Sequence, residues 1–159
     1  MLVIGGLSKS MSMTGWRLGW LCGDADVVRS ALVLHGYTTT CASTVSQKAG
    51  LAAWTAEAAE ARRAMRKTFR ERRDHLLGLL SNELHLRAVG PEGAFYAMVD
   101  VSAHGDSMSV AERLLEGGVI TVPGAAFGPE GEGYLRVSFC ADLDVLAEGV
   151  KRMKAALRP

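Results

Sequence analysis

The sequence predicts an α/β fold, and three observations support this. Short apolar runs with the composition of β-strands alternate along the chain with longer segments whose apolar residues recur at helical spacing. No segment is repeated, so the elements belong to one layered fold and not to a repeat array. The chain has 159 residues, 48% hydrophobic and 22% charged, which is enough for a compact domain with its own core.

The N-terminal part is predicted to contain two short strands followed by helices. Residues 1–5 and 16–22 have the composition of buried strands. Asp24 is a suitable N-cap for a helix that runs to about Leu34, because its carboxylate can accept hydrogen bonds from the first free backbone amides. After this helix we expect a polar, threonine-rich turn over 35–43, followed by two helices over 44–54 and 57–80.

The C-terminal half is predicted to form a small α/β sandwich, with one sheet under helices. A helix that Asp106 or Ser107 caps should stop at Gly117, and a last helix should start at Asp142. The strands expected in this half are 84–89, 94–101, 119–122 and 134–139, with a glycine-rich loop over 123–133.

Composition excludes several classes of function. The net charge of +1 argues against general nucleic-acid binding, which usually requires a basic domain. A run of arginines and lysines in the helix over 57–80 is interpreted as the solvated face of that helix. The sequence has no apolar run long enough to cross a membrane and no leader pattern, so we expect a soluble cytoplasmic protein without a membrane partner.

The cysteines point to a reducing compartment. Cys22, Cys41 and Cys140 are odd in number and widely spaced, without a CxxC pair or a histidine at ligand spacing. We therefore expect reduced thiols and no metal site.

The segment GGLSKS at 5–10 places Lys9 directly after the first strand, and Arg17 follows eight residues later. A phosphate-binding P-loop does not fit, because a serine precedes the lysine and the glycine spacing is wrong. From these six residues alone, a solvated loop lysine is the simplest interpretation. The alternative is a Schiff-base lysine, for which Arg17 would supply a second cation and a phosphate ligand.

Three longer motifs resemble one family. SKSMSMTGWRLGW at 8–20 resembles the lysine signature of the class I and II pyridoxal-phosphate-dependent aminotransferases, which have the fold-type-I architecture. PEGAFYAMVDVS at 91–102 and VPGAAFGPEGEGYLRVSF at 122–139 resemble two further family motifs, in the family's order.

The resemblance implies a role for each matching residue. Lys9 would bind the aldehyde of pyridoxal 5'-phosphate and later act as the general base, and Ser8 and Arg17 would hold the phosphate. Arg136 would bind the substrate α-carboxylate. The substrates would be an amino acid and a 2-oxo acid, in a homodimer whose interface includes Tyr37 and the loop that follows it.

The resemblance also implies a domain organisation. Residues 1–45 would be the C-terminal remnant of the cofactor-binding large domain, 46–82 connecting helices, and 83–159 a complete small α/β domain. The family places its lysine past the middle of the chain, so we expect a truncated chain that lacks several cofactor contacts and has little or no transaminase activity alone. Gly6 also departs from subfamilies that have a phosphate-binding serine there.

Two alternatives stay open. Fold does not fix the reaction, so the same scaffold could serve a carbon–sulfur lyase, a decarboxylase or a synthase. The chain could also be a non-catalytic, aminotransferase-like effector module, which a DNA-binding helix-turn-helix upstream would indicate.

Overall fold

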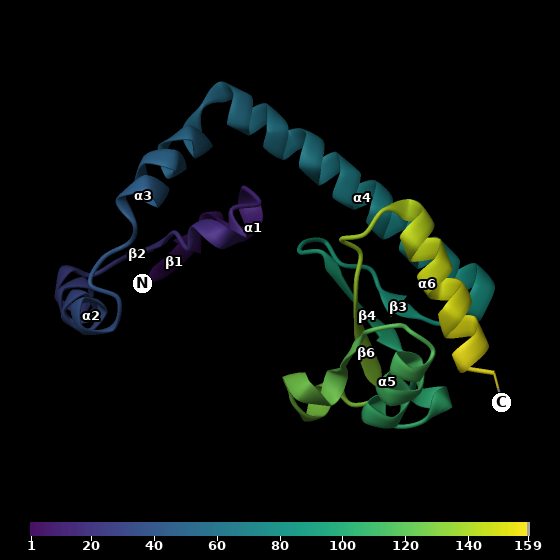
Figure 1. Cartoon of the computed structure of the whole chain (residues 1–159). Helices are drawn as coiled ribbons and strands as arrows, with labels where there is room; N and C mark the ends of the chain where they lie inside the picture. The colour runs from purple at the N-terminus through teal and green to yellow at the C-terminus, as the bar shows by residue number, and fades with distance from the viewer. Residues whose placement is uncertain (159) are drawn as a thin grey trace. The chain divides into compact units, whose positions relative to one another are not determined.

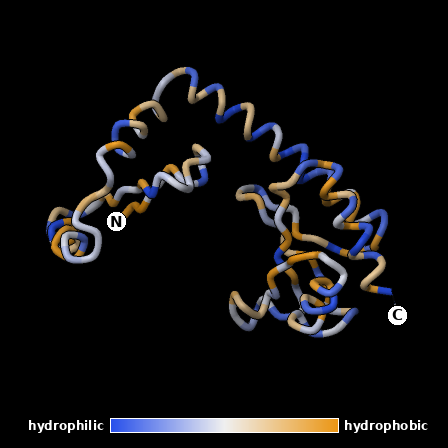
Figure 2. Tube along the Cα trace, viewed as in Figure 1, coloured by the Kyte–Doolittle hydropathy of each residue, from blue (hydrophilic) through white to orange (hydrophobic). Residues whose placement is uncertain are grey.

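The computed structural model describes residues 1–158, and the chain divides into two compact units, Met1–Arg66 and the residues from Lys67 onward. Figure 1 shows the elements of both units. The long helix α4 (Ala56–Leu84) begins in the first unit and ends in the second. In Figure 2 hydrophilic residues recur along this helix, in agreement with its many arginines.

The first unit contains a two-stranded antiparallel sheet and short helices. Strand β1 (Val3–Gly6) pairs with β2 (Gly19–Cys22), and Gly6 lies opposite Gly19 at one end of the ladder. The helical elements of this unit, besides the start of α4, are α1 (Leu7–Ser10), η1 (Thr14–Trp16), α2 (Ala25–Thr38), α3 (Thr44–Gly50) and η2 (Leu51–Trp54).

Helix α2 is longer than the sequence predicts. The N-cap is as expected, because the Asp24 carboxylate accepts hydrogen bonds from the amides of Asp26 and Val27. The turn expected over 35–43 is wrong in its first residues, since the helix continues to Thr38. The Thr38 hydroxyl donates to the Leu34 carbonyl at 3.0 Å, so this threonine bonds back within the helix instead of breaking it.

The second unit contains a four-stranded antiparallel sheet in the order β3-β4-β6-β5. Its strands are β3 (Ala88–Val89), β4 (Tyr96–Asp100), β5 (Val122–Pro123) and β6 (Tyr134–Ser138). Its remaining helices are η3 (Ser102–His104), α5 (Ser107–Glu116), η4 (Gly124–Phe127), η5 (Pro129–Gly131) and α6 (Leu143–Ala156). The α/β fold class is thus confirmed, although β5 is shorter and later than expected, and short helices interrupt the loop at 123–133.

One face of this sheet holds the core. In β4 the buried residues are Ala97 and Val99, and in β6 they are Leu135 and Val137, so burial alternates along both strands. Side chains from α4, α5 and α6 complete the cluster, among them Leu76, Leu80, Val110, Leu114, Leu146, Val150 and Met153. The alternate positions, which include Tyr96 and Arg136, therefore project from the opposite face of the sheet.

Candidate functional site

The lysine segment begins where the β1–β2 ladder ends. Leu7 is buried, and its amide donates to the Leu18 carbonyl at 3.2 Å, which extends the pairing by one residue. A Cβ added to Gly50 would lie 2.5 Å from Leu18 Cδ2 and 3.2 Å from Leu7 Cδ1, so α3 packs closely on both leucines. These contacts fix the first residue of α1 and thereby the direction in which Ser8 and Lys9 leave the sheet.

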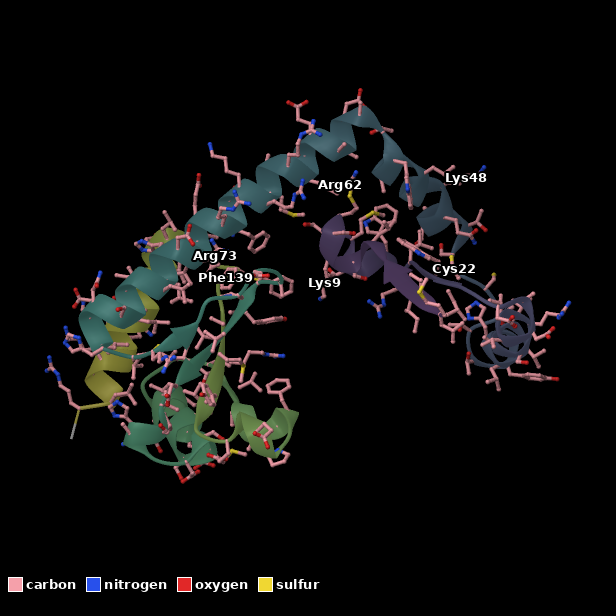
Figure 3. The ribbon with its side chains drawn as sticks, turned by 180° about the vertical axis from the view of Figure 1, so that it is seen from behind. Lys9, Cys22, Lys48, Arg62, Arg73 and Phe139 are labelled. Atoms are coloured by element: carbon pink, nitrogen blue, oxygen red, sulfur yellow. The ribbon has the colours of Figure 1, made fainter. Side chains whose placement is uncertain are left out.

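Ser8, Lys9 and Arg17 leave the ladder at the same end. Ser8 is half-buried and Lys9 is exposed on the single turn of α1, where Figure 3 labels it. The backbone hydrogen bond between Leu7 and Leu18 brings the segment of Lys9 next to that of Arg17. Lys9 lies two residues after Leu7, and Arg17 lies one residue before Leu18. The structure thus places an amine, a hydroxyl and a guanidinium on adjoining segments.

Arg17 has an unusual backbone conformation. It has a φ of 51°, in the left-handed region that L-residues seldom adopt. Its Nη1 donates to the Thr14 carbonyl at 2.9 Å, which turns the side chain back over η1. A guanidinium has five N–H donors, so the others stay available for an anion.

The environment of Lys9 differs from that of a typical Schiff-base lysine. Such an amine is favoured in its neutral form when it is desolvated, whereas Lys9 is exposed here. The donor set itself, a primary amine with a hydroxyl and a guanidinium nearby, still fits an aldehyde and a phosphate group.

Arg136 lies in the second unit, at the centre of its sheet. Its Cα is opposite Met98 of β4 and Val122 of β5. The guanidinium Cζ lies over two aromatic rings, 4.3 Å from the ring centroid of Tyr96 and 4.7 Å from that of Phe127. Both distances are within the range of favourable cation–π contacts, so the rings restrict where the guanidinium can lie.

The electrostatic environment of Arg136 favours an incoming anion. Its Nε is buried without a hydrogen-bond partner, and none of the salt bridges among the described residues involves this arginine. A buried donor without an acceptor costs free energy, and a carboxylate that accepted from it would remove that cost. The side chain therefore has the chemistry of an arginine prepared for an acidic ligand.

Among residues 1–158 no group of histidine, cysteine and acidic side chains has the arrangement of a metal site. Across the same residues, none of the helices combines the length and the apolar character that crossing a bilayer requires. All three cysteines are free and exposed.

Sequence reasoning missed several residues that shape the environment of Arg136. Tyr96 and Phe127 lie inside the quoted motifs, but nothing in the local pattern indicates that their rings meet the arginine. Glu132 and Ser107 were also missed as partners, although the Glu132 carboxylate accepts from both the amide and the hydroxyl of Ser107. These contacts join residues 25 apart, a separation that no periodicity reveals.

Comparison with known proteins defines the class. The sequence profile of the family "Aminotransferase class I and II" matches residues 1–153. The chain therefore belongs to the class I and II aminotransferase family.

Individual relatives agree with this assignment. The chain is 42% identical over 155 residues to the probable N-acetyl-LL-diaminopimelate aminotransferase of Bacillus subtilis, covering 96% of this chain and 39% of that protein. It is 38% identical over 161 residues to the aspartate/prephenate aminotransferase of Thermus thermophilus, and this match covers 98% of this chain and 40% of that protein.

Solved structures show the same relationship. The aromatic aminotransferase of Pyrococcus horikoshii superposes with a TM-score of 0.93 and is 35% identical in sequence. The maleate complex of the Thermus thermophilus aspartate aminotransferase superposes with a TM-score of 0.88 and is 38% identical. Each superposition covers 98% of this chain, but only 42% of the Pyrococcus chain and 41% of the Thermus chain. The chain thus spans about 40% of the length of these relatives.

Proposed function

We propose that this chain forms the lysine-bearing and carboxylate-binding part of a pyridoxal-phosphate-dependent aminotransferase, which transfers an amino group from an amino acid to a 2-oxo acid. The observation that carries the proposal is the state of Arg136, whose buried Nε has no acceptor while its guanidinium lies over two rings. The relatives named above are all aminotransferases, which favours transamination over the lyase, decarboxylase and effector alternatives.

The residues of the first unit would hold the cofactor. Lys9 would bind the aldehyde carbon through its amine, and Ser8 and Arg17 would donate hydrogen bonds to the phosphate oxygens. When bound, pyridoxal phosphate supplies an electron sink that stabilises negative charge at the substrate α-carbon. Lys9, once released by the incoming amino acid, would carry the proton to and from that carbon as a general base.

Arg136 would orient the substrate. A guanidinium can donate two parallel hydrogen bonds to a carboxylate, which fixes the plane of the carboxylate and the direction of the bonds at the α-carbon. The rings of Tyr96 and Phe127 keep the guanidinium from reorienting and exclude some water from it. Amino acids and 2-oxo acids share this carboxylate, so one arginine would serve both half-reactions.

The assembly and the location are also part of the proposal. Helix α2 exposes apolar side chains, including Leu32, Val33, Leu34 and Tyr37, which supports a homodimer with Tyr37 and the following loop near its interface. Three exposed free cysteines support a reducing, cytoplasmic location. Light scattering of the purified chain would measure the assembly.

A chimera tests the catalytic proposal. Residues 1–159 would replace the matching part of the Thermus thermophilus aspartate aminotransferase, and turnover would be measured with amino acid and 2-oxo acid pairs. We expect activity in the chimera, its loss with Lys9→Ala, and no loss with the control Lys48→Ala on α3. The unmodified 159-residue chain is expected to show little or no turnover. An active chimera that tolerates Lys9→Ala would contradict the proposal.

A further inference from the structure

We propose that Glu132 and Ser107 are positioning residues for Arg136: they hold the loop over 124–131 so that the Phe127 ring covers the guanidinium. The functional consequence rests on the proposed role of Arg136 in binding carboxylates. The positioning itself depends only on contacts within the second unit.

Glu132 joins two parts of this unit through its carboxylate, the end of the loop and the start of α5. Oε1 accepts from the Ser107 amide at 2.7 Å and from the Gly133 amide at 2.8 Å, while Oε2 accepts from the Ser107 hydroxyl at 3.0 Å. Hydrogen bonds to a charged acceptor are stronger than those between neutral groups. The carboxylate therefore ties the end of the loop to the first residue of α5.

Ser107 carries the connection further into the loop. It is fully buried, and its Oγ accepts a hydrogen bond from the Ala125 amide at 3.3 Å. Ala125 is two residues before Phe127 in the short helix η4. The path from Glu132 through Ser107 thus reaches the segment that carries the aromatic ring.

The two ends of the loop also touch each other directly. A Cβ added to Gly124 would lie 2.0 Å from the Gly131 carbonyl oxygen, and one added to Gly131 would lie 2.1 Å from that of Gly124. Only glycine allows this approach. The loop is therefore closed at its base, and a displacement of Glu132 would be transmitted to η4.

Phe127 needs this support because its own burial is small. The residue is 53% exposed, so the hydrophobic effect contributes little to fixing the ring. Tyr96, by contrast, is fixed by the sheet, since β4 pairs with β6 along its whole length. Of the two rings over Arg136, only that of Phe127 depends on the hydrogen bonds of Glu132 and Ser107.

Nuclear magnetic resonance of the full ¹⁵N-labelled chain tests the positioning. The Arg136 Nε–H resonance should be displaced by ring currents, and Phe127→Leu should remove part of that displacement. We expect Glu132→Ala and Ser107→Ala to reproduce the effect of Phe127→Leu, and Glu132→Gln to give a smaller change because it keeps an acceptor for the two amides.

Controls separate positioning from a general loss of structure. Glu130→Ala changes an exposed carboxylate in the same loop and should leave the Arg136 resonance unchanged. The amide resonances of Leu135 and Val137 report whether β6 is intact in each variant. If β6 is intact and Glu132→Ala and Glu132→Gln leave the Arg136 resonance at its original position while Phe127→Leu moves it, the inference is wrong.

Titration with maleate connects the positioning to the proposed function. We expect maleate to shift the Arg136 resonance of the original chain, with an affinity about five- to tenfold weaker in Glu132→Ala, because an arginine that is less preorganised must be ordered on binding. Equal maleate affinity in the two proteins would overturn the functional part of the inference. Absence of maleate binding in the original chain would count against the carboxylate role of Arg136, and the resonance comparison without ligand still decides the positioning.

Discussion

Arg136 on β6 lies over the ring of Tyr96 on β4, with 4.3 Å between the guanidinium Cζ and the ring centroid. The two residues are diagonal neighbours on one face of the sheet, since the residue opposite Arg136 is Met98. The register of the sheet thereby brings one of the two rings over Arg136 next to it.

Replacing Arg136 should have little effect on stability. Arg136→Met loses cation–π contacts of about 0.5–1 kcal/mol each but also removes a buried donor without an acceptor, and the two effects oppose each other. We expect the free energy of unfolding in urea to change by less than about 1 kcal/mol. Leu135→Ala, one residue earlier and fully buried, should cost about 2–5 kcal/mol. A loss of similar size in both variants would show that Arg136 supports the fold.

Gly124→Ala should destabilise the second unit. The added Cβ would meet the Gly131 carbonyl oxygen at 2.0 Å, and backbone on both sides leaves little room for adjustment. We expect a loss of at least about 1–3 kcal/mol, the usual cost of overpacking. The control is Gly149→Ala on α6, where a Cβ would meet no atom within 4 Å and helix propensity should give a gain of up to about 1 kcal/mol. Chemical denaturation of both variants measures the difference.

Acidification should remove the contribution of the Glu132 carboxylate to the stability of the fold. The backbone hydrogen bonds from Ser107 and Gly133 lower the pKa of its carboxyl below the ordinary value of 4.5. A carboxyl whose pKa is lower in the folded than in the unfolded state stabilises the fold above the unfolded value, and this contribution disappears as the pH falls through the folded value. The stability difference between the original chain and Glu132→Gln should therefore be constant near neutral pH and shrink below 4.5.

Denaturation curves of both proteins between neutral and strongly acidic pH would measure this effect. The comparison of two proteins is needed because hydrogen bonds also lower the pKa of Asp100 and Asp106 in the same unit. A difference that stays constant throughout the acid range would contradict the prediction.

Hydrogen exchange should be faster in the first unit than in the second. Helix α2 has no buried residue, whereas β4 and β6 each contribute two residues to the core. Local opening is easier where few apolar contacts must be broken. We expect the α2 amides to lose protection well before those of Val99 and Leu135, as measured by mass spectrometry or nuclear magnetic resonance. The comparison applies to the chain at concentrations where light scattering shows a monomer, because the proposed homodimer would cover part of α2. Equal protection of α2 and the sheet in the monomer would contradict the prediction.

Local signals in the sequence predicted much of the fold. Asp24 and Asp106 accept hydrogen bonds from the first turns of α2 and α5, as their capping positions indicated. The polar composition of 35–43 predicted a turn too early, because Thr38 donates a hydrogen bond to a helical carbonyl and remains in α2. Composition alone does not distinguish a threonine that ends a helix from one that bonds within it.

The candidate site was less accessible to such reasoning. Motifs indicated Lys9, Ser8, Arg17 and Arg136, and these roles remain predictions. The chimera tests the role of Lys9, and the maleate titration tests that of Arg136. The partners of Arg136 depend on tertiary contacts: Phe127 reaches it through a loop that Glu132 fastens to a helix. Such contacts have no characteristic spacing, so only the folded chain reveals them.

Strand β6 has one face that packs in the core and one face outside it. Leu135 and Val137 face the core, and Tyr134, Arg136 and Ser138 face the other way. A library of single substitutions along this strand should therefore show a two-residue period in protein abundance. If Arg136 binds a carboxylate as proposed, ligand affinity should vary along the strand with the opposite phase. Under the proposed role of Arg136, substitutions on its face of β6 would change ligand binding while the residues that hold the core stay the same.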